Sequence, residues 1–467
     1  MKNSDSKAVK LIISILAIII IILVILLANM NDKGTKSGSG EVVVSNQTVL
    51  SVKTDNPDAT AVPSEIPTSE PTSEPTAEPT EVPLTYTEMT LLSTGDIMFH
   101  LPQINGAYNG NTDSYSFLNS FKYIKEIVSA ADYSVANFET TLHDTNYSGF
   151  PSFCAPVSTL DAIKDTGFNC LLFANNHMYD RRKEGLINTM NHFEEYGFQY
   201  LGATKDSSND PSWLLVEVNG IKIGMMNYTD SITGDSGSNH TINGGTIDKA
   251  DWDYMNVFVR GQENDLYERV QRDISVLKDQ GADILIMYIH WGNEYELTAN
   301  NDQKKMAQKF CDMGIDIILG SHPHVIQPME VLHSESTGKD SICFYSFGNL
   351  ISNQNRLTLP SYDNRIYTEN GLMVKMNIRK YSDDTVYVTE IDYTPTWVHR
   401  YMNNTGYYSH EIIPLPVSSD KQDYYGLTKS DFGVKHSTEA FEMTDKIFKD
   451  TVQAYNDNIQ IVISNKK

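Results

Sequence analysis

The chain has 467 residues, enough for a membrane anchor, a spacer and one large domain of about 300 residues or two smaller ones. Its formal charge of −24 excludes nucleic acid as the main partner, because binding to phosphate backbones requires many Lys and Arg side chains. The same charge opposes docking of a polyanion along an extended surface, so an anionic substrate must be met locally, by a metal ion or a small basic cluster.

Residues 11–28 form an almost unbroken apolar run, interrupted only by Ser14. This length matches a membrane-spanning helix and is long for the core of a signal peptide. Three lysines precede the run, so we expect a cytoplasmic N-terminus and an extracellular remainder. We therefore predict a single-pass signal anchor over residues 1–28 in the cell membrane, in contact with lipid through residues 11–28. Cleavage near Ala28–Met30 is the alternative.

Residues 29–85 are rich in Ser, Thr, Gly, Glu and Pro, and Glu-Pro-Thr recurs with small variations between Pro63 and Pro83. Such a segment buries too little apolar surface to fold, and its prolines favour an extended, semi-rigid chain. We predict an extracellular spacer. The composition does not distinguish a spacer that crosses a cell wall from an inert tether.

From Tyr86 onward, helix-like segments alternate with apolar strands that end in polar clusters. Gly167, Gly281 and Gly314 each stand between a helix-like segment and a strand, where a helix C-terminus favours a left-handed residue. Strands that alternate with helices pair mainly in parallel. The pattern therefore predicts an α/β domain, which we place over residues 86–400.

Beyond Asn349 the pattern changes. Alternating segments around 372–378 and 385–391 are expected to form antiparallel strands at an edge or in a second sheet. A loop is expected over 397–408. A C-terminal extension over 401–467 then carries one predicted helix, roughly 437–455, whose apolar face should pack against the domain.

Six predicted strands end in side chains of the kinds that bind metals. Ligand sites in open α/β sheets lie beyond the carboxyl ends of the strands, so these side chains should meet at one place. They are Asp96, Glu139, Asn176 with His177, His290, His322 with His324, and Asn349.

The most informative stretch is Gly320-Ser321-His322-Pro323-His324, which follows a β-branched apolar run at 315–319. Gly320 is expected to let the backbone turn sharply. Side chains at i and i+2 of an extended segment point to the same side, so both imidazoles should face one point. Neutral imidazole is a common ligand for zinc, iron and manganese. The alternative is a polar loop whose histidines are merely solvated.

The candidate ligands combine carboxylate, amide and imidazole donors: Asp96, Glu139, Asn176, His290, His322 and His324. This mixture suits one or two Mn, Fe or Zn ions better than Mg or Ca, and the absence of cysteine disfavours a structural zinc. Such a site lowers the pKa of bound water and supplies hydroxide near neutral pH. His177 could protonate a leaving group, or it could orient other ligands.

Six motifs occur in a fixed order: Gly95-Asp96-Ile97-Met98, Asn137-Phe138-Glu139, Asn175-Asn176-His177, His290-Trp291-Gly292, Gly320-Ser321-His322-Pro323-His324 and Ser346-Phe347-Gly348-Asn349. With these motifs the chain resembles the CapA-type poly-γ-glutamate capsule synthesis family, whose domain is related to the calcineurin-like metallophosphoesterases. The resemblance covers roughly residues 89–393.

This resemblance implies a four-layer α/β/β/α sandwich like that of metallo-dependent phosphatases. It also implies a membrane-anchored extracellular protein that acts in the production of polyglutamate or another cell-envelope polymer. The expected partners are membrane subunits of a polymer synthase and an anionic polymer or its precursor. Asp96, Asn176, His290, His322 and His324 stand where metallophosphoesterases keep metal ligands. Asn137, Trp291 and Asn349 are expected to contact substrate or to orient ligands.

Two departures from the phosphoesterase pattern concern the metal ligands. That superfamily opens with Asp-x-His, whereas here Asp96 is followed by Ile97-Met98 and His100 comes two positions too late. Its second motif normally supplies a bridging aspartate, and this chain has Glu139 near that position. Glu139 is therefore a candidate both for metal binding and for catalysis as a general base.

Three functions remain open. The chain is a metal-dependent hydrolase or transferase acting on an envelope polymer or its precursor, or a non-catalytic assembly or export subunit of a polyglutamate synthase. The third alternative is a metallophosphoesterase or nucleotidase that acts on small phosphorylated substrates. The anchor and spacer favour the first two.

The four cysteines show no CxxC pair and no spacing typical of a disulfide framework. Cys170 and Cys343 lie in strand-like runs and Cys311 lies in a helix-like run, where free cysteines are usually buried. Cys154 lacks a recognisable helix start or base nearby, which favours a packed thiol over a nucleophile.

Overall fold

The structure is a computed structural model that describes residues 84–208, 212–233 and 240–464. The predicted anchor at 11–28 and nearly all of the predicted spacer lie outside the described residues. Within the described part of the chain, no helix combines the length and apolarity needed to span a membrane.

The first large sheet places its strands in the order β21-β20-β19-β1-β4-β7-β8, and β18 pairs with β1. The neighbours β1, β4, β7 and β8 are parallel, whereas β19, β20 and β21 add antiparallel strands on the other side of β1. The bounds are Tyr86–Ile97 for β1, Tyr133–Phe138 for β4, Cys170–Leu172 for β7, Gln199–Leu201 for β8, Asn349–Ile351 for β18, Asn370–Tyr381 for β19, Val386–Met402 for β20 and Tyr408–Pro414 for β21.

The second large sheet has the order β12-β11-β10-β14-β15-β17-β16, and β9 and β13 also pair with β10. The central strands β10, β14, β15 and β17 are parallel. The bounds are Trp213–Val218 for β9, Ile221–Thr233 for β10, His240–Ile242 for β11, Gly245–Thr246 for β12, Val257–Val259 for β13, Ile284–His290 for β14, Ile317–Ser321 for β15, Ile326–Ser334 for β16 and Lys339–Phe347 for β17.

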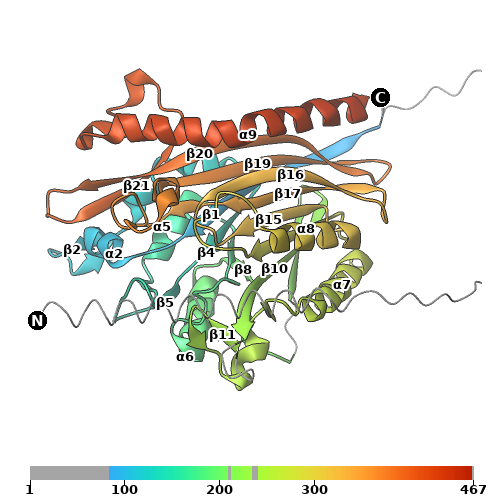
Figure 1. The fold of residues 1–467 in the computed structure, drawn as a ribbon, viewed down its shortest axis with the longest axis horizontal. Coiled ribbons are helices and arrows are strands. Elements are labelled where there is room, and N and C mark those ends of the chain that lie inside the picture. The colour runs from blue at the N-terminus through green and yellow to red at the C-terminus, as the bar shows by residue number, and fades with distance from the viewer. Residues whose placement is uncertain (1–83, 209–211, 234–239, 465–467) are drawn as a thin grey trace, which may run out of the picture. The chain divides into compact units, whose positions relative to one another are not determined.

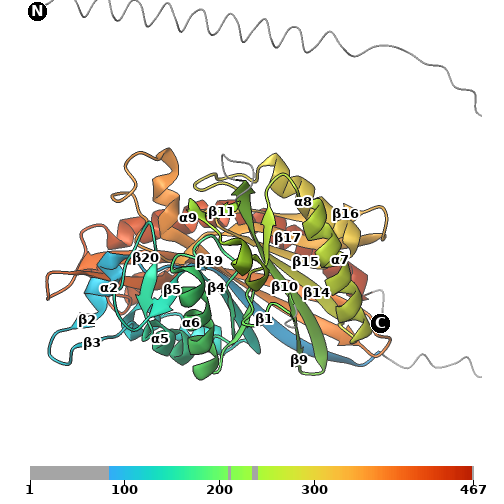
Figure 2. The ribbon, with the colours of Figure 1, turned by 90° about the horizontal axis from the view of Figure 1, so that it is seen from below.

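Helices cover the outer faces of the two sheets. Figure 2 shows α5 and α6 on one side of the molecule and α7 and α8 on the other. The helices are α2 (Leu101–Ala107), α3 (Leu118–Phe121), α4 (Lys125–Ser129), α5 (Thr159–Thr166), α6 (Arg182–Glu195), α7 (Asn264–Asp279), α8 (Asn301–Met313) and α9 (Gly433–Ser464). Short 3₁₀ helices span Lys249–Tyr254, Asp363–Glu369, Ser419–Lys421 and Leu427–Lys429. Two further sheets have two strands each: β2 (Tyr108–Asn109) pairs with β3 (Ser114–Tyr115), and β5 (Thr141–His143) pairs with β6 (Cys154–Pro156).

Alternation of side chains along the strands creates a core on each face of each sheet. Leu91 of β1 packs with Ile286 and Leu319 of the second sheet, so one core lies between the sheets. The next residue of β1, Leu92, faces the outer core shared with α3 to α6. A third core joins the second sheet to α7 and α8, with Phe310 of α8 at its centre. The prediction of a mixed α/β fold is confirmed.

The long helix α9 lies against β20 and β16, which belong to different sheets (Figure 1). Its Phe448 and Val452 reach the core between the sheets, where Phe448 contacts Phe344 of β17 and Tyr393 of β20. Near its C-terminal end, Tyr455 donates a hydrogen bond to the carbonyl of Val388 at 2.7 Å. The helix therefore closes one side of the space between the two sheets.

The C-terminal region departs from the expected loop and helix bounds. β20 continues to Met402 because its residues pair with β21, for example Trp397 with Ile413, so the loop expected over 397–408 is shorter. The boundary placed after residue 400 falls inside this strand. α9 extends beyond the expected 437–455 at both ends.

Other local expectations agree with the structure. Gly167, Gly281 and Gly314 have positive φ angles at helix C-termini, as the sequence predicts. β19 and β20 are antiparallel. All four cysteines are free and buried, which confirms the expectation of packed thiols.

Two buried histidines in the C-terminal strands make stability depend on pH. Burial lowers the pKa of His399 to about 4 and that of His410 to about 3, from an ordinary value of 6.5. Between these values the unfolded chain binds protons that the folded chain does not, so stability is complete above pH 6.5 and falls as the pH drops.

We therefore expect the free energy of unfolding to decrease from pH 7 toward pH 4. His410→Gln keeps a donor for Asn353, which lies 3.0 Å from His410 Nε2, and should flatten this slope by about 1.4 kcal/mol per pH unit. Denaturant unfolding of the full chain over this pH range measures the slope. The control is His333→Gln, a change at an exposed position, which should not flatten the dependence of the unfolding free energy on pH. An unchanged slope in His410→Gln would contradict the prediction.

Candidate metal centre

The carboxyl ends of strands from both sheets supply the predicted site residues. Asp96 lies near the end of β1, and Glu139 directly follows β4 in the same sheet. The backbone N–H of Glu139 donates to the carbonyl of Ile97 at 3.0 Å, which fixes Glu139 beside the end of β1. His290 is the last residue of β14 in the other sheet, and His322 follows the end of β15.

Gly320 has a different role from the one expected. It lies within β15, and a Cβ atom there would stand 2.0 Å from the carbonyl oxygen of Tyr345 and 2.5 Å from Trp291 Nε1. Glycine is needed at this position for close packing between strands, and the turn comes later, where His322 and His324 have φ angles of 99° and 55°. Such angles strain residues other than glycine, and strain of this kind concentrates at functional sites.

The segment is not extended as expected, and the two imidazoles contact different donors. His322 Nδ1 lies 3.1 Å from His290 Nε2, whereas His324 Nδ1 lies 3.1 Å from Asp96 Oδ2. The two histidines therefore belong to two neighbouring groups of candidate ligands.

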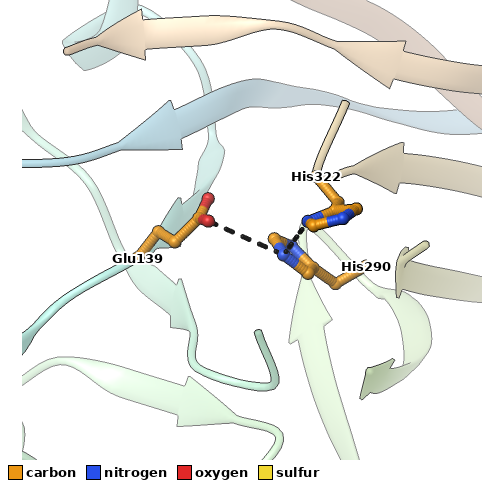
Figure 3. A group of neighbouring side chains, drawn as sticks. All are labelled: Glu139, His290 and His322. Atoms are coloured by element: carbon orange, nitrogen blue, oxygen red, sulfur yellow. Dashed lines mark hydrogen bonds and ion pairs between the residues drawn. The ribbon is translucent and has the colours of Figure 1, made fainter. Parts of the chain in front are cut away.

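Both groups share Glu139. One contains Glu139, His290 and His322 (Figure 3), and the other contains Asp96, Glu139 and His324, with one donor atom of each residue within 4.8 Å of the others. Glu139 Oε1 lies 3.7 Å from His290 Nε2 and 3.7 Å from His324 Nε2. This oxygen is buried and has no hydrogen-bond partner among the described residues. Glu139 thus stands between the two groups.

Three asparagines surround the groups. Asn176 Oδ1 lies 2.9 Å from His290 Nε2, which places its amide oxygen beside the His290–His322 group. Asn137 donates to Asp96 Oδ1 at 2.8 Å and to Glu139 Oε2 at 3.2 Å, so it orients both carboxylates. Asn349 donates to the carbonyl of His324 at 3.3 Å and supports the strained turn.

Burial sets the protonation of the cluster. It raises the pKa of Glu139, and the charge of Asp96 adds to this rise. Burial and neighbouring histidines lower the pKa of His290 and His322, which keeps these imidazoles neutral. Burial also acts to lower the pKa of His324, but the hydrogen bond and the charge of Asp96 outweigh it, so this pKa is raised.

These features fit a bound divalent cation. Neutral imidazoles are the form that binds metals, and the unpartnered oxygen of Glu139 is a buried acceptor without a hydrogen-bond donor. Carboxylates, imidazoles and an amide together suit a transition metal, and the two groups that share Glu139 offer room for one or two ions.

His177 belongs to neither group of candidate ligands and is paired with Asp180. Its Nδ1 lies 2.7 Å from Asp180 Oδ2, and both side chains are buried. Asp180 is held in turn by the backbone N–H of Phe153 at 2.6 Å and by Asn243 Nδ2 at 2.9 Å. Because a carboxylate only accepts hydrogen bonds, the pair assigns the proton to Nδ1 and leaves Nε2 for proton exchange with a substrate.

Two further residues of the site, Asp180 and Tyr295, are not indicated by any motif in the sequence. Asp180 is three residues from His177, a spacing that carries no signal without the fold. Tyr295 has a φ angle of 66°, donates its backbone N–H to the carbonyl of Pro323, and places its ring 6.2 Å from that of His324. Nothing in the local sequence distinguishes it from the other tyrosines.

Trp291 and His100 are supporting residues in this arrangement. Trp291 Nε1 donates to the carbonyl of Tyr345 at 3.0 Å, and its ring stacks on that of Tyr345 in the outer core. It also lines a cavity of about 400 Å³ beside the centre. His100 Nδ1 lies 3.3 Å from Gln103 Oε1, and His100 belongs to neither ligand group.

The chain is similar to proteins of capsule synthesis. A family model described as "Bacterial capsule synthesis protein PGA_cap" matches residues 90–354. A capsule biosynthesis protein CapA of Bacillus anthracis is 31% identical over 278 residues, which are 57% of this chain and 60% of that protein. A PGA biosynthesis protein CapA of Bacillus subtilis is 25% identical over 344 residues, 72% of this chain and 76% of that protein.

A solved structure of a putative 5'-nucleotidase from Staphylococcus aureus matches with 13% identity and a TM-score of 0.36, over 72% of this chain and 57% of the other. A score of this size supports no inference about fold or function.

Removal of two imidazoles should abolish metal binding. Elemental analysis of the purified full chain is expected to find a transition metal, and His322→Ala/His324→Ala should weaken its affinity by orders of magnitude, because one donor is lost from each group. His333→Ala removes an exposed imidazole and should retain the metal. Thermal unfolding of each variant checks the fold. A folded double variant that holds as much metal as the wild type would rule these residues out as ligands.

Proposed function

This chain belongs to the bacterial capsule synthesis protein family PGA_cap, and on that premise we propose that it acts in the production of a poly-γ-glutamate capsule or a related cell-envelope polymer. Within that process we assign it a chemical step as a metal-dependent hydrolase or transferase. Its substrate is the anionic polymer or a precursor of it.

The observation that carries the chemical role is the position of Glu139. Its buried, unpartnered oxygen is 3.7 Å from an imidazole of each ligand group. A purely structural carboxylate at this depth would be expected to have hydrogen-bond donors on both oxygens. A divalent ion held there would act as a Lewis acid toward a carbonyl or phosphoryl oxygen and would lower the pKa of water.

The residues of the chain supply the rest of the chemistry. Asn137 holds the carboxylates of Asp96 and Glu139 in a fixed orientation, so no reorganisation is needed when substrate binds. His177, oriented by Asp180, can accept a proton at Nε2 and pass it to a leaving group. The deep burial of Glu139 keeps bulk water away and strengthens these electrostatic interactions.

A non-catalytic assembly or export subunit is the second candidate, favoured by Met98. This buried residue occupies the place where phosphoesterases carry the histidine of Asp-x-His, so the group around Asp96 contains three donor residues. In this role the domain would hold a polyglutamate chain for a membrane synthase without breaking a bond.

The expected anchor places the domain outside the cell, next to membrane subunits of the synthase. In the proposed arrangement, the two sheets and their covering helices form the four layers, α/β/β/α, of a metallo-dependent phosphatase-like domain held off the membrane by the spacer.

This topology predicts that protease added to intact cells releases a soluble fragment containing the domain, because the spacer lies outside. Immunoblotting of the medium detects the fragment. Protection of the domain until cells are lysed would contradict the orientation.

Glu139→Gln decides between catalyst and scaffold. It keeps the shape of the side chain and removes the charge, so polymer production in cells that lack the native protein should not be restored. His177→Asn should also reduce production, because the proton donor is lost. Glu335→Gln, an exposed change of the same type, should restore it fully.

Thermal unfolding of each purified variant shows whether the loss comes from chemistry or from folding. Full restoration by a stably folded Glu139→Gln protein would favour the assembly subunit.

A further inference from the structure

A second cavity, of about 350 Å³, is lined in part by Asp180, the partner of His177. Its lining includes His143 at the end of β5, Asn146, and the start of α6 with Arg181, Arg182 and Glu184. Asp180 completes this wall. None of the metal-ligand candidates belongs to the lining, so the cavity is separate from the metal centre.

The two adjacent arginines have no carboxylate partner. Among residues 84–208, 212–233 and 240–464, no carboxylate oxygen lies within 4.0 Å of either guanidinium, although Arg260, Arg356 and Arg379 each have one. Arg181 Nη2 instead donates to the carbonyl of Asn146 at 2.8 Å and to Ser148 Oγ at 2.7 Å. Both guanidinium groups thus lack a direct ion pair in a chain of net charge −24.

One donor of this pair is also without an acceptor. Arg181 Nε is buried and makes no hydrogen bond with the described residues. The guanidinium of Arg182 donates to the carbonyl of Thr246 and lies 5.6 Å from the centre of the Tyr179 ring, so it too contacts only neutral groups. Planar guanidinium groups match the geometry of carboxylates and phosphates, which can accept two parallel hydrogen bonds.

The acidic residues of the wall do not fill this need. Both oxygens of Asp180 are already engaged, Oδ2 by His177 and the backbone of Phe153, and Oδ1 by Asn243. Glu184 is exposed in the first turn of α6. The arginines therefore remain available to an anion from outside.

Asp180 connects the cavity to the metal centre. It lines the cavity, and its Oδ2 lies 2.7 Å from Nδ1 of His177, the proposed proton donor. A ligand in the cavity would thus contact the residue that orients this donor. An acidic chain repels a polyanion over most of its surface, so a place where two guanidinium groups lack ion-pair partners is one where it can bind.

We propose that this cavity binds an anionic group of the substrate, with Arg181 and Arg182 as its receptors. The group is a carboxylate or a phosphate, and its capture positions a neighbouring bond of the same substrate at the metal centre. This inference rests on the proposed function for its substrate, an anionic polymer or precursor. The binding site itself stands on the unpaired arginines.

Calorimetric titration of the full chain tests the proposal with two probes, a γ-linked tetraglutamate and inorganic phosphate. Arg182→Met removes one charge from an exposed side chain, and we expect it to weaken binding by about tenfold or more, the usual effect of losing a charge-assisted contact. Arg181→Lys keeps the charge but loses the fork, and should also weaken binding. Arg272→Met on α7 is the control, because it removes an exposed charge far from the lining.

The two probes distinguish the sources of the anion. Binding of tetraglutamate that depends on Arg182 supports a carboxylate subsite, and binding of phosphate alone with the same dependence supports a phosphate subsite. Equal losses in Arg182→Met and Arg272→Met would reduce the effect to net charge and overturn the proposal, as would unchanged binding in Arg182→Met. Failure of the wild type to bind either probe would also overturn it.

Metal content, measured on the same samples, separates this inference from the proposed function. If the protein holds the expected metal but Arg182→Met binds the probes as well as the wild type does, the anion subsite alone is refuted. If the protein holds no transition metal but its binding of a probe depends on Arg182, the metal-dependent chemistry is refuted and the anion site is retained.

Discussion

The centre of this molecule depends on one constraint: a fully buried carboxyl group has an oxygen that receives no hydrogen bond. Glu139 holds this group where strands of both sheets end, and burial there raises its pKa. Removing a carboxylate from water costs several kcal/mol unless a positive partner compensates. Burial lowers the pKa of His290 and His322, so these two imidazoles supply little compensation. The donor set therefore suits a cation, and the asparagines around it fix the positions of the donors without adding charge.

The two-sheet architecture allows this arrangement because each sheet contributes a different type of donor. Strands of the first sheet bring the carboxylates, and strands of the second bring the imidazoles. The core between the sheets holds their carboxyl ends in register with one another. Close packing at Gly95, whose added Cβ would stand 2.0 Å from the carbonyl oxygen of Gly348, and at Gly320 leaves little freedom for either edge. The geometry of the centre thus depends on backbone contacts as much as on its ligands.

Local sequence was sufficient to predict the central strands, the glycines at three helix C-termini and the residues that gather at the strand ends, because strand periodicity and glycine caps are local signals. It failed where a partner far along the chain decides the outcome. The extent of β20 depends on pairing with β21, and the role of Asp180 depends on Phe153 and Asn243. The two histidines of the Ser-His-Pro-His stretch were identified, but their backbone angles are imposed by tertiary packing, so the division of the ligands into two groups could not be foreseen.

The position of α9 has a consequence for the order of folding during synthesis. Residues from near the C-terminus, Phe448 and Val452, fill the side of the core between two sheets whose first strand begins at Tyr86. All six strand ends of the centre leave the ribosome well before this helix does. The core between the sheets is therefore not closed on this side until the last segment docks, because contacts over such a long stretch of chain form late. Until then the rings of Phe344 and Tyr393, which Phe448 contacts in the folded domain, lack this cover, and this side of the core is the part of the nascent chain most open to aggregation.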